Sequence, residues 1–250
     1  MKATTQKPKL QSRQGLFHFI LSSNTLLAAF LLLFSIAAKA NDRPYFESKD
    51  YFHWSDVPSG NWNNNNLNKA KSSYAEGDVV AHAFVPNGLS NDGTVYTWIL
   101  KYDYYLATKN AGGFINLLWD PVQFSKSPGD YFDLTSPLSG AASQTLVPIG
   151  TYVSKNISLV SVTQLTDEPG QTTRKVWEIK FTYTGSTGSD AALYFGLQLA
   201  KKDDVPGANG AAAWAGASLQ TDLGQQSDPG TRSLQIDPGA IRTACETPPT

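Results

Sequence analysis

The 250-residue chain carries 20 basic and 21 acidic residues, which gives a formal net charge of −1. Because the Lys and Arg residues are scattered and balanced by acids, the composition argues against a nucleic acid or an anionic membrane surface as partner. The single cysteine, Cys245, excludes an internal disulfide, so the fold must depend on burial of side chains alone.

The first forty residues are typical of a secretory signal peptide. Basic residues up to Arg13 precede an apolar core at residues 25–38, and Ala38-Lys39-Ala40 is the small-x-small pattern that a signal peptidase cuts. An uncleaved anchor over residues 16–38 is the alternative, but the polar residues 22–24 interrupt that span. We therefore predict cleavage between Ala40 and Asn41.

The mature chain is then predicted to be secreted, extracellular or at a cell surface, with no membrane segment left. Five of the 20 basic residues leave with the signal peptide, so 15 remain against 21 acids, a formal charge of −6. Residues 41–60 are predicted to form an N-terminal arm or short strand, residues 61–243 a β-sandwich domain and residues 244–250 a tail. In that tail Cys245 is either an unpaired thiol or a site of pairing with another chain.

Alternation of apolar and polar residues at period two recurs through the mature chain, which predicts strands rather than helices. Residues 94–105 are the clearest case: the face formed by Tyr96, Trp98, Leu100 and Tyr102 is predicted to point inward, and the face of Val95, Thr97 and Ile99 outward. The predicted strands are 78–85, 94–105, 113–119, 157–165, 174–185, 191–200 and 232–237.

Pro-Gly pairs such as Pro169-Gly170 and Pro206-Gly207 mark turns between these strands, because proline fixes φ and glycine accepts positive φ. Many strands, repeated turns and no crossover helices predict an all-β fold, an antiparallel β-sandwich. The segment 207–226 is rich in Gly and Ala, and we predict a long surface loop that tucks Trp214 back onto the core.

One segment carries a family resemblance. Ser73, Tyr74, Glu76, Gly77 and Asp78 lead into an alternating strand, and Tyr102-Asp103-Tyr104, then Gly112-Gly113-Phe114, follow along the chain. This order is similar to that of immunoglobulin-like or prealbumin-like β-sandwich modules of bacterial secreted and cell-surface proteins. The resemblance covers most of residues 60–243. It implies a repeat module with a scaffolding or adhesive role more readily than an enzyme.

The carboxylates of Glu76 and Asp78 allow two interpretations. In the first they serve the entry into a strand, with Gly77 at a tight bend and the acids bonded to backbone or neighbouring side chains. In the second they join acids of another loop, Asp203 and Asp204, in a calcium site. Neither the spaced acidic loop of an EF-hand nor a nonapeptide repeat is present, so no cofactor is predicted and calcium is the alternative.

Aromatic side chains offer the other functional hint. Trp54, Trp62 and Trp214 lie in segments with little regular pattern, where exposed rings can stack on sugars, whereas tryptophans on strands usually fill the core. A surface glycan, or another protein module, is therefore the predicted partner.

Catalytic motifs are not evident. The mature chain has two histidines, His53 and His82, without the spacing of a zinc centre, and it shows no nucleophile elbow or phosphate loop. A glycosidase needs only a carboxylate pair, which sequence does not exclude. The predicted function is a non-catalytic secreted module with a structural or adhesive role, with sugar binding as first alternative and a secreted hydrolase as second.

Overall fold

The computed structural model describes residues 48–57, 60–124, 141–224 and 231–244. By its internal contacts the chain divides into two units, Met1–Arg43 and Pro44–Thr250, and every described residue lies in the second. The predicted signal peptide, its cleavage site and Cys245 lie outside the described residues.

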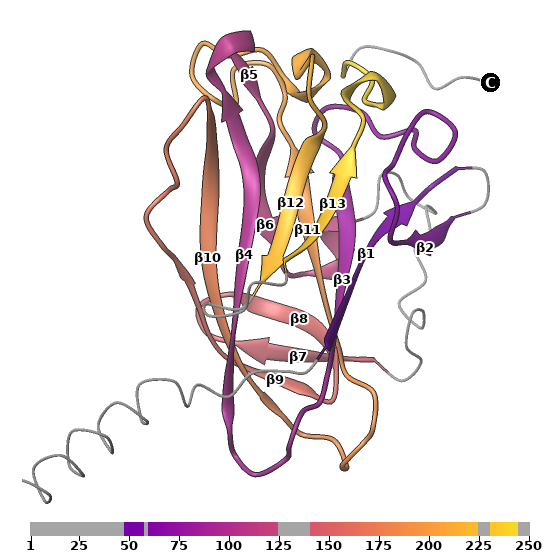
Figure 1. The fold of residues 1–250 in the computed structure, drawn as a ribbon, viewed down its shortest axis with the longest axis vertical. Coiled ribbons are helices and arrows are strands. Elements are labelled where there is room, and N and C mark those ends of the chain that lie inside the picture. Colours follow the sequence, from indigo (N-terminus) through magenta and orange to yellow (C-terminus); the bar gives the residue numbers. More distant parts are fainter. Residues whose placement is uncertain (1–47, 58–59, 125–140, 225–230, 245–250) are drawn as a thin grey trace, which may run out of the picture. The chain divides into compact units, whose positions relative to one another are not determined.

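The described residues form two antiparallel sheets that pack as a sandwich, as the period-two alternation predicts (Figure 1). Sheet A contains β1 (Ser48–Ser55), β2 (Asn61–Asn63), β3 (Val79–Asn87), β6 (Phe114–Leu118), β7 (Ala142–Leu146), β8 (Gly150–Lys155) and β11 (Ala192–Leu199). Sheet B contains β4 (Val95–Leu106), β5 (Ala111–Gly112), β9 (Ile157–Gln164), β10 (Thr172–Tyr183), β12 (Leu219–Gly224) and β13 (Arg232–Ile236).

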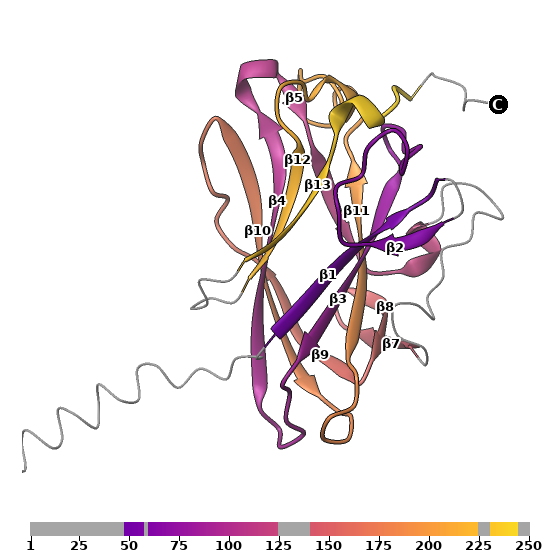
Figure 2. The same ribbon diagram turned by 45° about the vertical axis from the view of Figure 1, so that its right-hand side comes forward.

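The strand order is β2-β1-β3-β11-β8-β7 in sheet A, with β6 also paired to β11, and β13-β12-β4-β10-β9 in sheet B, with β5 paired to β4. Short 3₁₀ turns connect some of them: η1 (Ala107–Lys109), η2 (Pro121–Phe124), η3 (Ala211–Ala213) and η4 (Pro238–Ala240). The predicted N-terminal arm contains β1, a full member of sheet A. Figure 2 shows β1 and β13 on the same side of the sandwich.

The predicted inward face of the strand at 94–105 is confirmed. Tyr96, Trp98, Leu100 and Tyr102 of β4 are at most 3% exposed, while Val95 on the other face is 41% exposed. Alternation sets this register because burying the aromatic face removes more apolar area from water.

Aromatic rings fill the space between the sheets. Phe84 of β3 meets Trp98 of β4 with 4.4 Å between ring centroids, and Tyr96 stacks on Phe181 at 5.6 Å. The strands β3 and β11 are buried on both faces, because Trp54, Trp62 and other apolar side chains pack on the side of sheet A away from this core. Burial on both faces explains why the sequences of β3 and β11 are almost continuously apolar.

The segment predicted as a surface loop at 207–226 requires correction. It contains η3 and β12, and β12 is an interior strand of sheet B between β13 and β4. Leu219, Thr221 and Leu223 are buried there, whereas the residues between them are half-buried. The flanking Gly and Ala residues conceal this short alternation. The second half of the expectation holds, because Trp214 is 1% exposed in the main core.

Candidate functional site

The structure places the three tryptophans of the predicted sugar platform in two different clusters. Trp214 belongs to the core between the sheets, and Trp54 and Trp62 pack on the other side of sheet A. Trp54 is 8% exposed and meets Trp62 edge to face, with 5.4 Å between centroids. The half-buried ring of Trp62 also lies 5.7 Å from that of Tyr194. These residues do not form one flat, exposed stacking surface.

The segment that carries the family resemblance joins distant parts of the chain. Ser73 bonds to the Asp56 carboxylate through its N–H (2.9 Å) and its hydroxyl (2.6 Å). The buried Tyr74 hydroxyl donates to the Trp54 carbonyl (2.9 Å). Arg242, near the C-terminal end of the described chain, donates to the Ser73 carbonyl from Nε (3.1 Å) and Nη2 (2.7 Å). The segment therefore ties β1 to the region after η4.

The acids of the same segment also bond to backbone. Glu76 Oε1 accepts the Ala212 N–H at 3.1 Å, and Asp78 Oδ2 accepts the Ala75 N–H at 2.7 Å. Gly77 has φ +89°, and its N–H donates to the Leu199 carbonyl of β11 at 2.9 Å. The predicted bend at Gly77 and the predicted bonds of its flanking acids are thus confirmed.

The other proposed calcium ligands lie in a separate turn. Asp204 Oδ2 accepts the Lys201 N–H at 2.6 Å, and Asp203, with φ +68°, donates its N–H to the Ala208 carbonyl at 2.9 Å. Among the described residues, no three His, Cys, Asp or Glu side chains come together as a metal group. The carboxylates of the two turns are therefore not assembled into one calcium site.

Gly77→Val should destabilise the protein by about 1–3 kcal/mol, because a β-branched residue is strained at positive φ and its Cβ would meet the Lys201 side chain. Gly188→Val is the matched control, since Gly188 also has positive φ (+79°) but faces open space. Urea denaturation should show the smaller loss for Gly188→Val. Equal losses would mean that the surroundings of Gly77 contribute nothing.

Calcium or a chelator should leave the melting temperature unchanged if Glu76 and Asp78 serve only the fold, because a ligand of the folded state raises that temperature by mass action. Differential scanning calorimetry measures this directly. A calcium-dependent rise that Asp78→Asn abolishes would replace the strand-entry interpretation by the metal-loop one.

Two histidines face each other in the interior, which sequence did not show. His53 of β1 and His82 of β3 are cross-strand partners, both 0% exposed, with ring centroids 6.0 Å apart. His53 Nε2 donates to the Asn65 carbonyl (2.7 Å) and His82 Nδ1 to the Val80 carbonyl (2.8 Å), since a carbonyl only accepts. Each bond therefore places the proton of the neutral imidazole on the bonded nitrogen, which fixes the tautomer.

Burial dominates the electrostatics of this pair. Burial lowers the pKa of His53 to about 4. The bond to the Asn65 carbonyl acts to raise this pKa, and the Lys71 charge acts to lower it. Burial and the neighbouring His53 lower the pKa of His82 well below its usual value. His82 also stacks on Tyr51 and on Phe195, at centroid distances of 5.5 and 5.3 Å, and these two rings stack on each other at 6.2 Å. Neutral, packed imidazoles of this kind serve the core rather than proton transfer with solvent.

One arginine bridges two carboxylates on the outer side of sheet B. Arg174 of β10 lies 3.0 Å (Nε) from Asp103 of β4 as an ion pair, and its Nη1 donates to Asp222 of β12 at 2.6 Å. Gln220 donates its backbone N–H to Asp103 (2.8 Å) and its side-chain amide to Asp222 (2.7 Å), and Ser233 donates its hydroxyl to Asp222. The carboxylates are thus occupied by bonds across four strands.

Burial raises the pKa of Asp103, and the Gln220 N–H and the Arg174 charge offset it only in part. A raised pKa is what a general acid needs, so Asp103, with Asp222 beside it, is the group to test for the hydrolase alternative. The oxygens of both carboxylates, however, bond to groups of the same sheet, which favours a structural role.

Arg174→Met should lower the free energy of unfolding by about 2–3 kcal/mol at pH 7, because two poorly solvated carboxylates lose their counter-charge; partial exposure of all three side chains keeps the loss below that of a fully buried pair. Arg174→Lys, which keeps the charge, should lose less. Guanidinium would screen the effect, so urea denaturation is the measurement. A loss below 0.5 kcal/mol for Arg174→Met would show that the network is no more than a surface ion pair.

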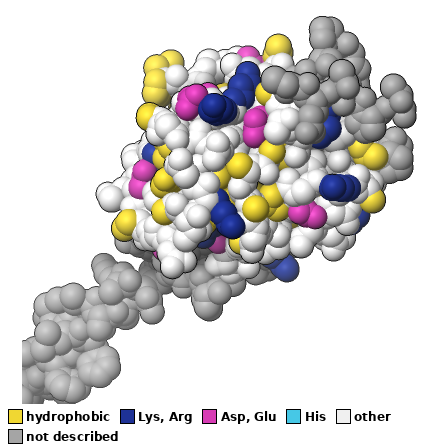
Figure 3. Space-filling view, turned by 90° about the horizontal axis from the view of Figure 1, so that it is seen from above, with side chains coloured by type: hydrophobic (Ala, Val, Ile, Leu, Met, Phe, Trp, Pro, Cys, Tyr) yellow, Lys and Arg dark blue, Asp and Glu magenta, His cyan; other side chains and the backbone are white. Residues whose placement is uncertain are grey.

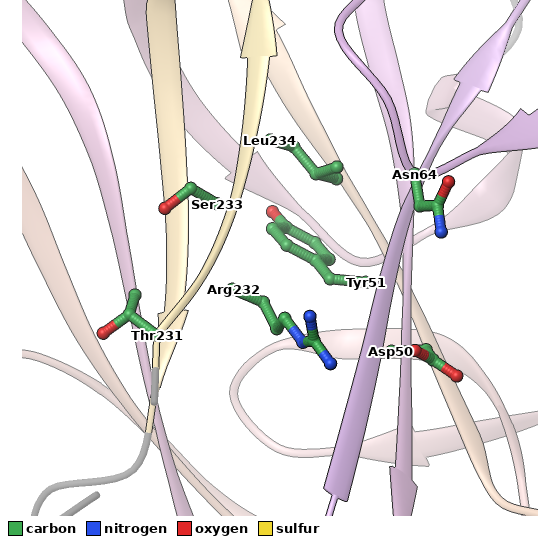
Figure 4. Close-up of a pocket in the computed structure, with 7 residues that line it drawn as sticks. All are labelled: Asp50, Tyr51, Asn64, Thr231, Arg232, Ser233 and Leu234. Atoms are coloured by element: carbon green, nitrogen blue, oxygen red, sulfur yellow. The ribbon is translucent and has the colours of Figure 1, made fainter. Parts of the chain in front are cut away.

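A groove lies between β1 and β13, at the side of the sandwich where the two sheets meet. It has a volume of about 260 Å³ and is lined by Asp50, Tyr51, Asn64, Thr231, Arg232, Ser233 and Leu234. Figure 4 shows the Tyr51 ring between the two strands and the Arg232 side chain extending from β13 toward β1. The buried Tyr51 hydroxyl donates a hydrogen bond to Thr221 Oγ1 of β12 (2.9 Å), and this bond fixes the ring in place.

The groove presents hydrogen-bonding groups of several kinds: an amide, a guanidinium, a carboxylate and hydroxyls. The edge of β13 adds backbone groups. The Leu67 N–H donates to the Gln235 carbonyl (2.9 Å), and the Leu67 carbonyl accepts the Asp237 N–H (2.8 Å), on the side of β13 away from β12. Because backbone groups alternate in direction along a strand, Ser233, two residues before Gln235, also directs its N–H and C=O to that side. Sequence gave no signal for this site, because its residues come from opposite ends of the described chain.

The surface seen from above in Figure 3 shows basic, acidic and hydrophobic side chains interspersed, without a patch of one sign. In the described part of the chain, no helix has the length and apolar character needed to cross a membrane. Comparisons with protein-family models, with curated proteins and with solved structures find no match for the chain.

Proposed function

We propose that the chain is a non-catalytic β-sandwich module of a secreted or cell-surface protein, with a structural or adhesive role. Its resemblance to immunoglobulin-like or prealbumin-like modules of bacterial surface proteins, and its two antiparallel sheets, support this assignment. The main observation behind the proposal is that the acidic side chains suited to catalysis or metal binding form hydrogen bonds and ion pairs within the domain. Glu76 and Asp78 hold backbone N–H groups, and Asp103 and Asp222 share Arg174 and Gln220.

Carbohydrate binding is the second candidate, and the groove rather than the tryptophans favours it. Sugar hydroxyls both donate and accept hydrogen bonds. Asn64, which can do both, Arg232, which donates, and Asp50, which accepts, line one groove beside the Tyr51 ring. The groove is polar and open along one strand edge, a geometry that suits an extended polar chain.

A glycan-array and cell-adhesion experiment on the secreted protein tests both candidates. An adhesive module should retain a glycan or surface partner, and Asn64→Ala together with Arg232→Ala should abolish retention if the groove is the binding site. Lys202→Ala is the matched control for the lost charge, since Lys202 is exposed and does not line the groove. Retention that survives the groove substitutions would exclude the groove, and turnover of any ligand would overturn the non-catalytic proposal.

A further inference from the structure

Among the described residues, none pairs with the outer edge of the second half of β9 in sheet B. Among the described strands, β9 pairs with β10 alone. Just beyond the ladder, the Leu165 N–H donates to the Val176 carbonyl of β10 at 2.8 Å. Because backbone groups point alternately toward and away from a partner strand, Gln164 and Val162 point theirs away from β10, to the open side.

The first half of the same edge is closed by side chains from sheet A. The Ile157 carbonyl accepts from Gln144 Nε2 (2.9 Å) and Ser154 Oγ (2.6 Å). The Leu159 N–H donates to the Tyr152 hydroxyl at 3.0 Å. These contacts show directly that Ile157 and Leu159 of β9 direct backbone groups away from β10, and that side chains of β7 and β8 bond to the Ile157 carbonyl and the Leu159 N–H.

No such contact protects the second half. Within the described part of the chain, the N–H and C=O of Val162 and Gln164 have no hydrogen-bond partner on the open side. A bulge at Val160, which is 46% exposed, separates this half from the closed one. Leu165 is 37% exposed, and residues 157–165 contain neither a charge nor a proline. Charges and prolines are the usual protection of a sheet edge against pairing.

We propose that this edge pairs antiparallel with the same edge of a second copy of the chain, about a two-fold axis at Thr163. Val162 of each copy then pairs with Gln164 of the other, which forms four backbone hydrogen bonds. A second copy fits because an uncharged strand meets no like-charge repulsion from itself, and because a two-fold contact uses the same patch twice. Such a small contact is weak, so the dimer forms where copies are concentrated.

Sedimentation velocity of the secreted protein over a concentration series tests the proposal. The wild type should show a concentration-dependent dimer. Gln164→Pro removes two of the four donors and places a ring at the edge, so the dissociation constant should rise about tenfold or more. Gln164→Ala keeps the N–H and should dimerise like the wild type. A monomer at the highest soluble concentration, or equal association of the two variants, overturns the proposal.

Disulfide trapping gives an independent readout. Thr163 and its symmetry mate form a non-hydrogen-bonded pair with about 4.5 Å between Cα atoms, within the range of a disulfide. In a Cys245→Ser background, Thr163→Cys should cross-link with oxidised glutathione much faster than Thr187→Cys, an exposed control in the turn after β10. Equal cross-linking of the two variants contradicts pairing at this edge.

Discussion

Trp214→Ala should lower the free energy of unfolding by about 3–5 kcal/mol, the range for deleting a buried tryptophan from a core. The ring is 1% exposed and lies against Gly113, where an added Cβ would be 3.0 Å from the indole. It follows η3, so its loss also removes the anchor that returns this segment to the core before β12 begins.

Urea denaturation followed by circular dichroism measures this loss. Trp62→Ala is the matched control, because Trp62 is half-buried on the other side of sheet A and should cost less. If the Trp214 substitution cost no more than that of Trp62, the segment at 207–218 would be peripheral to the fold, contrary to the burial of its tryptophan.

Lowering the pH from 7.5 to 5 should reduce the free energy of unfolding by about 4 kcal/mol through His53 and His82 together. The unfolded imidazoles bind protons below their usual pKa of 6.5, whereas the folded pKa of His53 is about 4 and that of His82 is well below 6.5. Stability is therefore full above pH 6.5 and falls as the pH decreases toward 4, because protons favour the unfolded state. Each histidine contributes about 1.4 kcal/mol per pH unit in that window.

His82→Phe tests the origin of this pH dependence. A phenyl ring suits the ring contacts that His82 makes with Tyr51 and with Phe195, and it removes one of the two titrating groups, so the loss between pH 7.5 and 5 should halve. Urea denaturation at the two pH values is the measurement, at pH values above the usual range of carboxylates. An unchanged pH dependence in His82→Phe would show that other groups cause it.

The elements that sequence located best are those with one apolar and one wet face. The register of β4 followed from the alternation of Tyr96 to Tyr102, because a slip by one residue would expose that aromatic face. The interior strand β12 escaped prediction because Gly and Ala surround its three buried residues. The strands β7 and β8 were not predicted either, since their short sequences, ASQTL and GTYVSK, carry few apolar residues.

Less of the candidate site than of the fold could be predicted from the sequence. The bend at Gly77 was predictable, because a glycine between two acids before a strand indicates a turn locally. The His53–His82 pair depends on the register of β1 against β3, and the partners of Arg174 come from β4 and β12. The groove likewise requires β1 and β13 to lie together, which only the strand order of both sheets determines.

Mass spectrometry of glycans incubated with the protein tests the central claim, that the chain binds without catalysis, most directly. The account predicts that every glycan keeps its mass, including any that the protein retains through Asn64 and Arg232. Release of a cleaved product by the wild type, lost in Asp103→Asn or Asp222→Asn variants that remain folded, would contradict it and identify the carboxylates around Arg174 as catalytic.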